Sequence, residues 1–344
     1  MKNNITYRMV QDELRHRTGV VIPVYIPAGL RASEVAAHIH DTAASYCACV
    51  GDPCHVCLSV DGNGSGDREA AQIAAEFGAQ SIVCPVNRGK FQGAMMGARV
   101  LLEDQKINWL AVVDQDGDHF ANELPNFIRT ALFMRKSTGN GRLLVLGRRN
   151  SRHRPMGWLR GEAEELADRM MLDALSYHAV TSNTPLDLQF TAAHDEFPDF
   201  HSGYKMFSRI SAGDVFSRDP DLAGCSENAC YRHGVEAVMT VEALLNGAVL
   251  GVLTRSTYNE QPMSTFGLMN RTQLLADMII WPCKRLNIPA VFMRQWLSNH
   301  ISRLDLNTLV PQGREELNRV RQLVLRAWGD AADDLAPVNG PLFV

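Results

Sequence analysis

Three aspartates at alternate positions form the most chemically suggestive segment of the sequence. Asp114, Asp116 and Asp118 follow an apolar run directly. Clustered carboxylates repel one another, and Mg²⁺ or Mn²⁺ bound through one or two of them plus substrate phosphates would offset that repulsion. A solvated acidic loop is the alternative. An EF-hand is excluded, because its sixth position would be His119 instead of Gly and its twelfth Pro125 instead of Glu.

Two other turns carry residues that can hold a phosphorylated ligand. Asp61 precedes a glycine-rich turn, in which the backbone can approach a ligand closely while the carboxylate accepts hydrogen bonds from a base or a ribose. Lys90 follows Asn87, Arg88 and Gly89 at the start of a helical pattern, where its ammonium and the helix amides can meet phosphate or sugar hydroxyls. An ordinary turn and a structural helix cap explain these two segments equally well. Neither matches the Walker A or the dinucleotide-binding spacing.

The elements that must position these turns alternate regularly along the chain. Short β-branched runs predict strands buried on both faces, and the segments between them carry apolar residues at helical spacing. This rhythm predicts a parallel sheet with right-handed crossovers and a ligand site outside the carboxyl ends of its strands. The expected strands are 19–25, 55–61, 81–85, 109–114 and 143–146, and the expected helices are 34–46, 68–77, 89–102, 125–135, 162–177 and 235–245.

Composition excludes several classes of protein. The 344 residues are 46% hydrophobic and 21% charged, which is typical of a globular chain and excludes disorder, collagen and coiled coil. The 34 Lys and Arg against 38 Asp and Glu leave a net charge of −4, so no global basic field would recruit nucleic acid or an anionic membrane. We expect no transmembrane segment and no secretion signal, and therefore a cytoplasmic protein.

Eight cysteines in such a chain are expected to be reduced thiols. Cys47, Cys49, Cys54 and Cys57, with His55 between them, could also be arranged as a zinc site. The first pair is separated by one residue instead of the usual two to four, which favours buried free thiols.

The segments described so far resemble, in order and spacing, the nucleotide-sugar half of the family-2 glycosyltransferases with the GT-A fold. The residues that carry the resemblance are the strand 20–24, the Asp61 turn, the segment 87–90 and Asp114-Gln115-Asp116. Within the family, 114–125 is most similar to dolichyl-phosphate mannose synthases, and Gly234-Val235-Glu236 is similar to glucosyl-3-phosphoglycerate synthases.

The resemblance implies an α/β protein with a Rossmann-like, mostly parallel sheet flanked by helices. The GT-A domain would span 18–255, with a nucleotide-sugar half at 18–120 and an acceptor half at 121–255. A helical C-terminal extension would follow over 256–344.

The resemblance also implies a nucleotide-diphosphate sugar as donor and Mn²⁺ or Mg²⁺ as cofactor. Pro23 and Val24 would line the nucleotide pocket, and Asp61 would hold the base. Asp114 would contact ribose or sugar, and Asp116 and Asp118 would bind the metal. We add Lys90 to the donor-side residues because of its position at the helix start.

The second half of the chain would supply the acceptor side. The segment 200–209 resembles the stretch beneath the family's acceptor pocket, and Glu236 resembles the acidic base of inverting members. Interaction of Glu236 with the helix macrodipole explains its position equally well. Retaining relatives take a downstream metal-ligating His, and 258–261 contains none, so inversion is preferred.

These features predict a metal-dependent glycosyltransferase that acts on a hydroxyl acceptor, either a small molecule or a lipid-linked one. A homodimer is compatible with the sequence. The apolar stripe 278–281 is expected in a core or helix interface, and contact with the inner face of a membrane is the alternative. One rival function is a sugar-phosphate nucleotidyltransferase, although 24–31 lacks the Gly-rich loop with Arg and Lys that this enzyme needs. The other rival is a catalytically silent GT-A domain that binds nucleotide-sugar or glycan.

Overall fold

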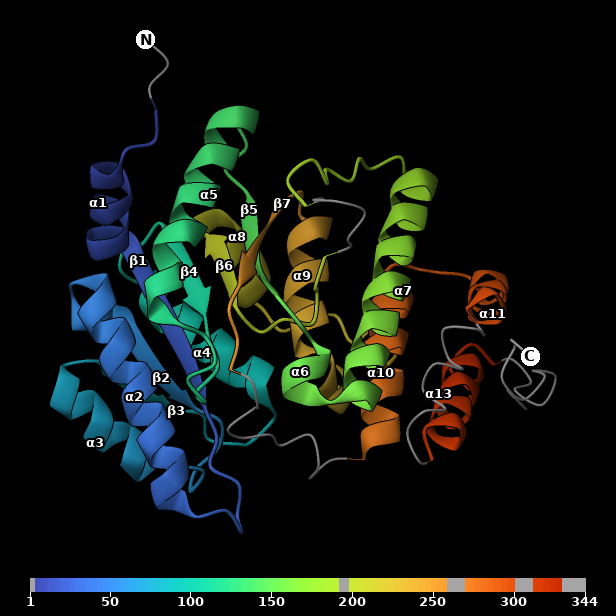
Figure 1. Ribbon diagram of the computed structural model, residues 1–344, viewed down its shortest axis with the longest axis horizontal. Helices are drawn as coiled ribbons and strands as arrows, with labels where there is room; N and C mark the ends of the chain where they lie inside the picture. The colour runs from blue at the N-terminus through green and yellow to red at the C-terminus, as the bar shows by residue number, and fades with distance from the viewer. Residues whose placement is uncertain (1–3, 192–197, 259–269, 301–311, 330–344) are drawn as a thin grey trace. The chain divides into compact units, whose positions relative to one another are not determined.

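The computed structural model describes residues 4–191, 198–258, 270–300 and 312–329 (Figure 1). The chain forms two compact units and passes between them more than once. The first unit comprises 1–150, 187–220 and 238–258, and the second comprises 151–186, 221–237 and 259–344. The domain boundaries expected from the sequence stay a prediction.

A seven-stranded sheet organises the first unit, with the strand order β3-β2-β1-β4-β6-β5-β7. Only β6 is antiparallel to its neighbours, β4 and β5, while the remaining pairs are parallel. This sheet confirms the predicted fold class of an α/β protein with a Rossmann-like, mostly parallel sheet. The strands are β1 (Thr18–Val24), β2 (Val56–Val60), β3 (Gln80–Val83), β4 (Trp109–Val112), β5 (Leu143–Arg149), β6 (Lys205–Ser208) and β7 (Val249–Arg255).

Helices cover both faces of this sheet. Helices α2 and α3 pack side by side, and α1 contacts both α2 and α5, whereas α4 packs with α8 (Figure 1). The crossovers β1-α2-β2 and β2-α3-β3 advance in one direction along the sheet, and the crossover β3-α4-β4 runs in the opposite direction. Because such crossovers are right-handed, α4 lies on the opposite face of the sheet from α2 and α3. The helices of this unit are α1 (Tyr7–Arg17), α2 (Ala32–Val50), α3 (Asp67–Phe77), α4 (Lys90–Leu102), α5 (Leu124–Thr138) and α8 (Arg209–Phe216), with short turns η1 (Pro53–His55) and η2 (Ala121–Glu123).

The core lies along β1, whose seven residues are all buried. Two glycines let α4 approach this strand closely. A Cβ at Gly97 would lie 2.6 Å from Val21 Cγ1, and one at Gly93 would lie 3.2 Å from Pro23 Cβ. The small residues at the start of α4 therefore bring the helix onto the sheet and fix the position of Lys90 at its first turn.

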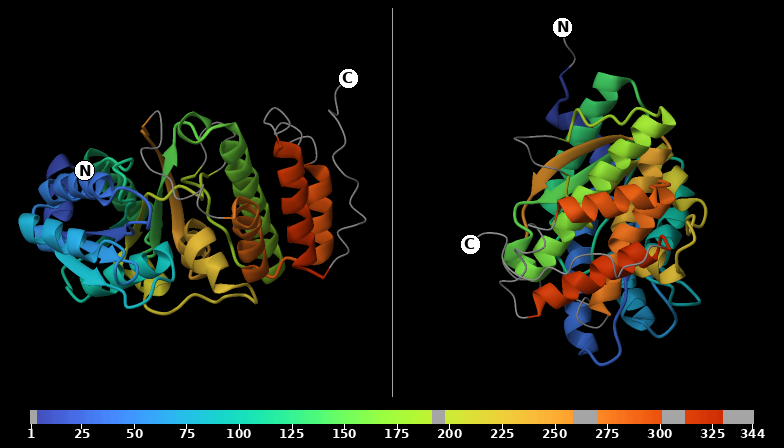
Figure 2. Two further views of the ribbon diagram at one scale, coloured as in Figure 1. Left: turned by 90° about the horizontal axis from the view of Figure 1, so that it is seen from below. Right: turned by 90° about the vertical axis from the view of Figure 1, so that its right-hand side faces the viewer.

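The described part of the second unit consists of helices and the segments that join them. Helix α10 packs against α7, α13 and the π-helical turn η3, and α11 and α13 lie side by side in both views of Figure 2. The stripe Met278 to Trp281 is buried in α10, as expected for a core segment. The helices are α6 (His153–Met156), α7 (Trp158–Ser182), η3 (Ala229–His233), α10 (Arg271–Arg285), α11 (Ala290–Asn299) and α13 (Gly313–Arg326), and α9 (Val235–Leu245) belongs partly to each unit.

Among the helices that the structure describes, none has both the length and the apolar character required to cross a bilayer.

Candidate functional site

The acidic loop, which we define as residues 114–119, starts just after β4 and beside the end of β1, because the two strands run parallel. Gln115 anchors it to β1. The Tyr25 N–H donates to Gln115 Oε1 at 2.8 Å, and Gln115 Nε2 donates to the Tyr25 carbonyl at 2.7 Å. From α2, the Thr42 hydroxyl donates to the Gln115 carbonyl at 3.2 Å. The loop is therefore fastened both to the strand end and to the helix that covers it.

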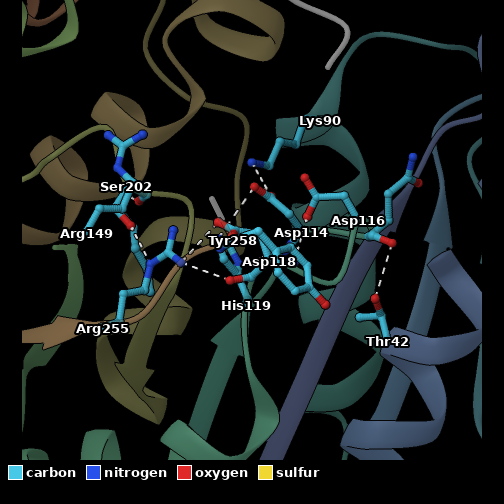
Figure 3. Close-up of polar contacts among 12 residues, drawn as sticks. Thr42, Lys90, Asp114, Asp116, Asp118, His119, Arg149, Ser202, Arg255 and Tyr258 are labelled. Carbon is cyan, nitrogen blue, oxygen red and sulfur yellow. Dashed lines mark hydrogen bonds and ion pairs between the residues drawn. The ribbon is translucent and has the colours of Figure 1, made fainter. Parts of the chain in front are cut away.

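Asp114 pairs with the lysine that opens α4. Lys90 Nζ lies 2.5 Å from Asp114 Oδ1 and points at it (Figure 3). Burial would raise the pKa of Asp114, but the nearby Lys90 ammonium, together with Arg255, outweighs burial and holds this pKa well below its usual range. Asp114 is therefore ionised at neutral pH.

His119 folds back on the start of the loop. Its Nδ1 accepts the Asp114 N–H at 2.9 Å, and its ring stacks on Tyr204 with centroids 5.0 Å apart. Burial lowers the pKa of His119 well below its usual value, so the ring is neutral and carries its proton on Nε2. That nitrogen lies 3.7 Å from Asp114 Oδ2. The Tyr46 hydroxyl donates to the His119 carbonyl at 2.9 Å, which closes the loop onto α2.

Asp118 is held from the end of β7. Arg255 Nη1 donates to Asp118 Oδ2 at 3.2 Å and to its carbonyl at 3.0 Å, and the Tyr258 N–H donates to Asp118 Oδ1 at 2.6 Å (Figure 3). Arg255 is 2% exposed. This buried pair sets the conformation of the second half of the loop.

Asp116 differs from its two neighbours. It is 8% exposed, and its Oδ1 accepts the Asp118 N–H at 3.2 Å. Across the described part of the chain, no basic side chain forms an ion pair with it. Burial, followed by the charges of Asp114 and Asp118, raises the pKa of Asp116 to about 7. The loop thus holds a buried carboxylate whose charge is poorly compensated, and a bound cation would supply what it lacks.

A buried polar cluster supports the loop from the segment 199–205. Asp199 is fully buried and accepts Arg149 Nε at 2.7 Å and Arg149 Nη2 at 2.6 Å. Lys205, also fully buried, donates to the carbonyls of Phe200 and Ser202. These bonds shape the turn at Gly203, where a Cβ would lie 2.8 Å from Asp114 Oδ2. The backbone at 203 therefore lies directly against the Asp114 carboxylate.

Asp61 occupies the end of the neighbouring strand β2 and is 3% exposed. Its Oδ1 accepts the Arg88 N–H at 3.0 Å, and its Oδ2 accepts the Gly89 N–H at 2.8 Å. The carboxylate therefore fixes the turn that leads into Lys90. Asp61 and Asp114 both hold the start of α4, one through the backbone and the other through the lysine side chain.

In the second unit, a group of three side chains places its potential metal-ligating atoms close enough together to hold an ion. Within the described ranges, three such atoms converge within 4.8 Å at His153, Glu162 and Glu165, and not at the acidic loop. His153 Nε2 lies 2.6 Å from Glu162 Oε1, and Arg169 Nη2 lies 3.3 Å from Glu165 Oε1. Arg152 Nη2 also lies 3.8 Å from Glu165 Oε2, and the His153 ring is hydrogen-bonded to Glu162, so the group is explained as a polar network that joins α6 and α7.

Comparisons with known proteins give a distant likeness only. No family model and no curated protein matches the chain. Among solved structures, the chain is similar to S. aureus TarS 1–349, at 10% identity and a TM-score of 0.41, with 91% of this chain and 90% of that chain covered. It is also similar to S. aureus TarS 1–349 in complex with UDP, at 12% identity and a TM-score of 0.41, with 90% and 82% covered. A further S. aureus TarS structure gives 12% identity and a TM-score of 0.40, with 90% and 55% covered.

The structure brings part of the predicted site together. Five of the predicted residues lie in the first unit at the ends of β2 and β4 and the start of α4: Asp61, Lys90, Asp114, Asp116 and Asp118. Pro23 and Val24 are buried in β1, and the Pro23 side chain packs against α4. Glu236 lies in the first turn of α9, in the second unit. The binding and catalytic roles of these residues stay predictions, and of the segment 258–261 only Tyr258 lies among the described residues.

The contacts that hold the site in place were not predicted from the sequence. Arg149 follows an apolar run as one charge in a basic segment, yet it is 8% exposed and pairs with Asp199. Arg255 carries no local signal beyond a single charge after an apolar run. Gly203 falls in the segment 200–209, whose resemblance to an acceptor-side stretch does not predict its contact with Asp114. Their importance depends on contacts with residues more than 80 positions away, which no local pattern contains.

Proposed function

We propose that this chain is a metal-dependent glycosyltransferase that moves a sugar from a nucleotide-diphosphate donor to a hydroxyl acceptor with inversion. The observation that carries the proposal is Asp116, a buried acid with a raised pKa and no basic partner among the described residues. It lies where parallel strands end, which is the usual ligand-binding edge of an α/β sheet. The neighbouring Lys90–Asp114 pair brings a cation to the same edge.

The donor set of the acidic loop suits Mn²⁺ or Mg²⁺, because both ions prefer carboxylate oxygens and share them with phosphates. Asp116 is proposed as the main ligand. Asp118 is proposed as the second, since a carboxylate oxygen has two lone pairs and keeps one after accepting from Arg255 or Tyr258. Bound there, the ion would stabilise the negative charge that develops on the departing nucleotide.

The remaining residues would orient the donor. Lys90 would contribute its ammonium to the diphosphate, and Asp114 would accept hydrogen bonds from ribose or sugar hydroxyls. Asp61 would keep the start of α4 in place and hold the base with its remaining lone pairs. Glu236 is proposed as the base that accepts the proton of the acceptor hydroxyl, on the face of the sugar opposite the leaving group. The acceptor, a homodimer and a contact with the inner face of a membrane stay predictions.

A thermal-shift screen combined with a donor-hydrolysis assay tests this proposal. UDP-, GDP- and dTDP-glucose are each added to the full chain with Mn²⁺ and with EDTA. We expect one donor to raise the melting temperature strongly with Mn²⁺ and to lose most of that shift with EDTA, because ligands that bind the native state stabilise it by mass action. Asp116→Asn should reduce Mn²⁺-dependent hydrolysis at least about 100-fold, the scale expected for lost transition-state stabilisation.

Asp214→Asn is the matched control, because Asp214 is an acid of the same unit that pairs with Arg142 at the surface. This variant should behave like the wild type. Equal thermal shifts with and without the cation would contradict the role of the acidic loop. A cation-dependent shift without turnover for any donor would favour the silent, binding-only domain.

A further inference from the structure

A cavity adjoins the acidic loop on the side of α2. This pocket, which we name the α2 pocket, has a volume of about 400 Å³. Helix α2 contributes Asp41, Ser45 and Ala48, the segment after the acidic loop contributes Phe120 and Asn122, and the aromatic ring of Tyr258 also lines it. The volume lies within the range of roughly 300–1,000 Å³ that is typical of small-molecule sites. None of the donor-side residues assigned above lines this pocket.

The walls of the α2 pocket favour a neutral ligand rich in hydroxyls. The Asp41 carboxylate, the Ser45 hydroxyl and the Asn122 amide offer hydrogen-bond acceptors and donors. Phe120 and Tyr258 meet edge to face with ring centroids 5.1 Å apart, which adds an apolar surface. No Lys or Arg is found among the described residues that line the pocket, and Asp41 would repel an anion. A phosphate or carboxylate ligand is therefore disfavoured, whereas a saccharide suits both kinds of wall.

The α2 pocket shares a wall with the acidic loop. Gly117 lines the pocket with a φ of +81°, and a Cβ there would lie 3.6 Å from Tyr258 Oη and 3.8 Å from Thr42 Oγ1. Gly117 follows Asp116 directly, and the Thr42 hydroxyl bonds the Gln115 carbonyl. A ligand in the α2 pocket would therefore lie behind the segment that carries the proposed metal ligand.

We infer that the α2 pocket binds a neutral saccharide unit, which under the proposed function belongs to the hydroxyl acceptor. Only one part of this inference rests on the proposed function, namely that the bound saccharide belongs to the acceptor. Binding itself depends on the pocket walls. The pocket would hold part of an acceptor glycan by its hydroxyls and by the aromatic ring faces, next to the donor site but separate from it.

Filling the pocket provides a direct test. Ala48 is exposed on α2, so Ala48→Phe should fold normally while its ring occupies the cavity. Ala37→Phe is the matched control, because Ala37 is an exposed alanine on the same helix that does not line the pocket. Binding of glucose, galactose, N-acetylglucosamine and their β-1,4-linked disaccharides is measured by saturation-transfer NMR on the full chain without nucleotide. We expect at least one of these sugars to bind the wild type and Ala37→Phe, and its affinity to fall at least tenfold in Ala48→Phe.

The same samples are tested for the Mn²⁺-dependent donor shift, so the two proposals fail separately. Saccharide binding that is lost in Ala48→Phe supports the α2 pocket as a saccharide site even if no donor shift occurs. In that case, only the assignment of the saccharide as the acceptor is contradicted. The inference is overturned if no sugar in the panel binds the wild type or if Ala48→Phe binds as well as Ala37→Phe. Tighter binding of glucose 1-phosphate than of glucose would also overturn it, because the pocket would then select an anion.

Discussion

Asp61 and Asp116 lie just after parallel strands of one sheet and are almost equally buried, with exposures of 3% and 8%. Their surroundings differ. Asp61 accepts two backbone N–H groups from another segment, so its charge is solvated by the protein itself. Asp116 accepts one N–H from its own loop and lies between two other acids, which together with burial raise its pKa to about 7.

This contrast separates a carboxylate whose hydrogen bonds shape the fold from one whose charge the described fold leaves poorly compensated. A buried charge with fixed partners stabilises the arrangement of those partners, and its removal leaves them unsatisfied. A buried charge without adequate partners costs stability, and a protein retains it where the charge is used for binding or catalysis. Burial alone therefore does not identify a functional acid. A functional acid is identified instead by the direction in which substitution of that acid changes the stability of the protein.

The largest effect is expected for Asp199, a fully buried acid of the first unit that pairs with a buried arginine. It is fully buried and binds Arg149 through two charged hydrogen bonds and one backbone N–H. Asp199→Ala would leave the Arg149 guanidinium buried without this carboxylate, so we expect a loss of about 3–5 kcal/mol in the free energy of unfolding. Urea denaturation followed by circular dichroism measures the loss.

The Arg142–Asp214 pair provides the control for this prediction. Arg142 Nε lies 2.9 Å from Asp214 Oδ2, but the two side chains are 46% and 22% exposed. Asp214→Ala should therefore cost no more than about 1 kcal/mol. Similar losses in the two variants would show that burial does not strengthen the Arg149–Asp199 pair as proposed.

The second prediction has the opposite sign and concerns Asp116. Its pKa of about 7 in the folded chain exceeds the unfolded value of about 3.9. A raised pKa favours the protonated form in the folded state, so Asp116 lowers stability progressively as the pH rises from about 4 through 7. A tenfold difference in proton affinity between the folded and unfolded chains corresponds to about 1.4 kcal/mol. Asp116→Asn should therefore be more stable than the wild type at pH 8 by about 1.4–4 kcal/mol.

Unfolding curves of both proteins between pH 4 and 8, with EDTA present, measure this difference. It should shrink toward zero at pH 4, where the ionisation of Asp116 no longer opposes folding. Addition of Mn²⁺ at pH 8 should stabilise the wild type and leave Asp116→Asn almost unchanged. A variant that is less stable than the wild type at pH 8 would place Asp116 with the structural acids.

The elements of the parallel part of the sheet were predictable, because their signal is local. A strand covered by helices on both faces has a continuous apolar run, and β1, β2 and β4 match the expected strands closely. Strand β6 was not predicted, since its four residues include Lys205. That buried lysine is accommodated because backbone carbonyls of the turn 200–202 accept hydrogen bonds from its ammonium group. Strand β7 was also missed. Its apolar run follows the apolar helix α9 closely and ends in Arg255, whose buried charge is accommodated by hydrogen bonds to Asp118, Ser202 and Ser256.

The acidic loop could be recognised from the sequence as a candidate site, but the different partners of its three aspartates could not. Alternate spacing after a strand is visible in the sequence, whereas Lys90 and Arg255, the partners of Asp114 and Asp118, come from distant segments. Only their arrangement in space leaves Asp116 as the acid without a basic partner in the described structure. The α2 pocket likewise combines residues from three separate segments, and no local pattern indicates it.

The smallest expected effect tests Asp61, the fold-shaping member of the comparison. Asp61→Asn would replace one carboxylate oxygen by an NH₂ group, which cannot accept the Arg88 or Gly89 N–H, so one buried hydrogen bond to a charged acceptor is lost. We expect a loss of about 1–2 kcal/mol in unfolding free energy, independent of Mn²⁺. Asp67→Asn is the control, because Asp67 Oδ1 accepts the Gly64 N–H in an exposed turn and should cost less than about 0.5 kcal/mol. If Asp61→Asn instead kept full stability and lost only nucleotide binding, Asp61 would belong with Asp116 among the acids that serve a ligand, and its two backbone bonds would be incidental to the fold.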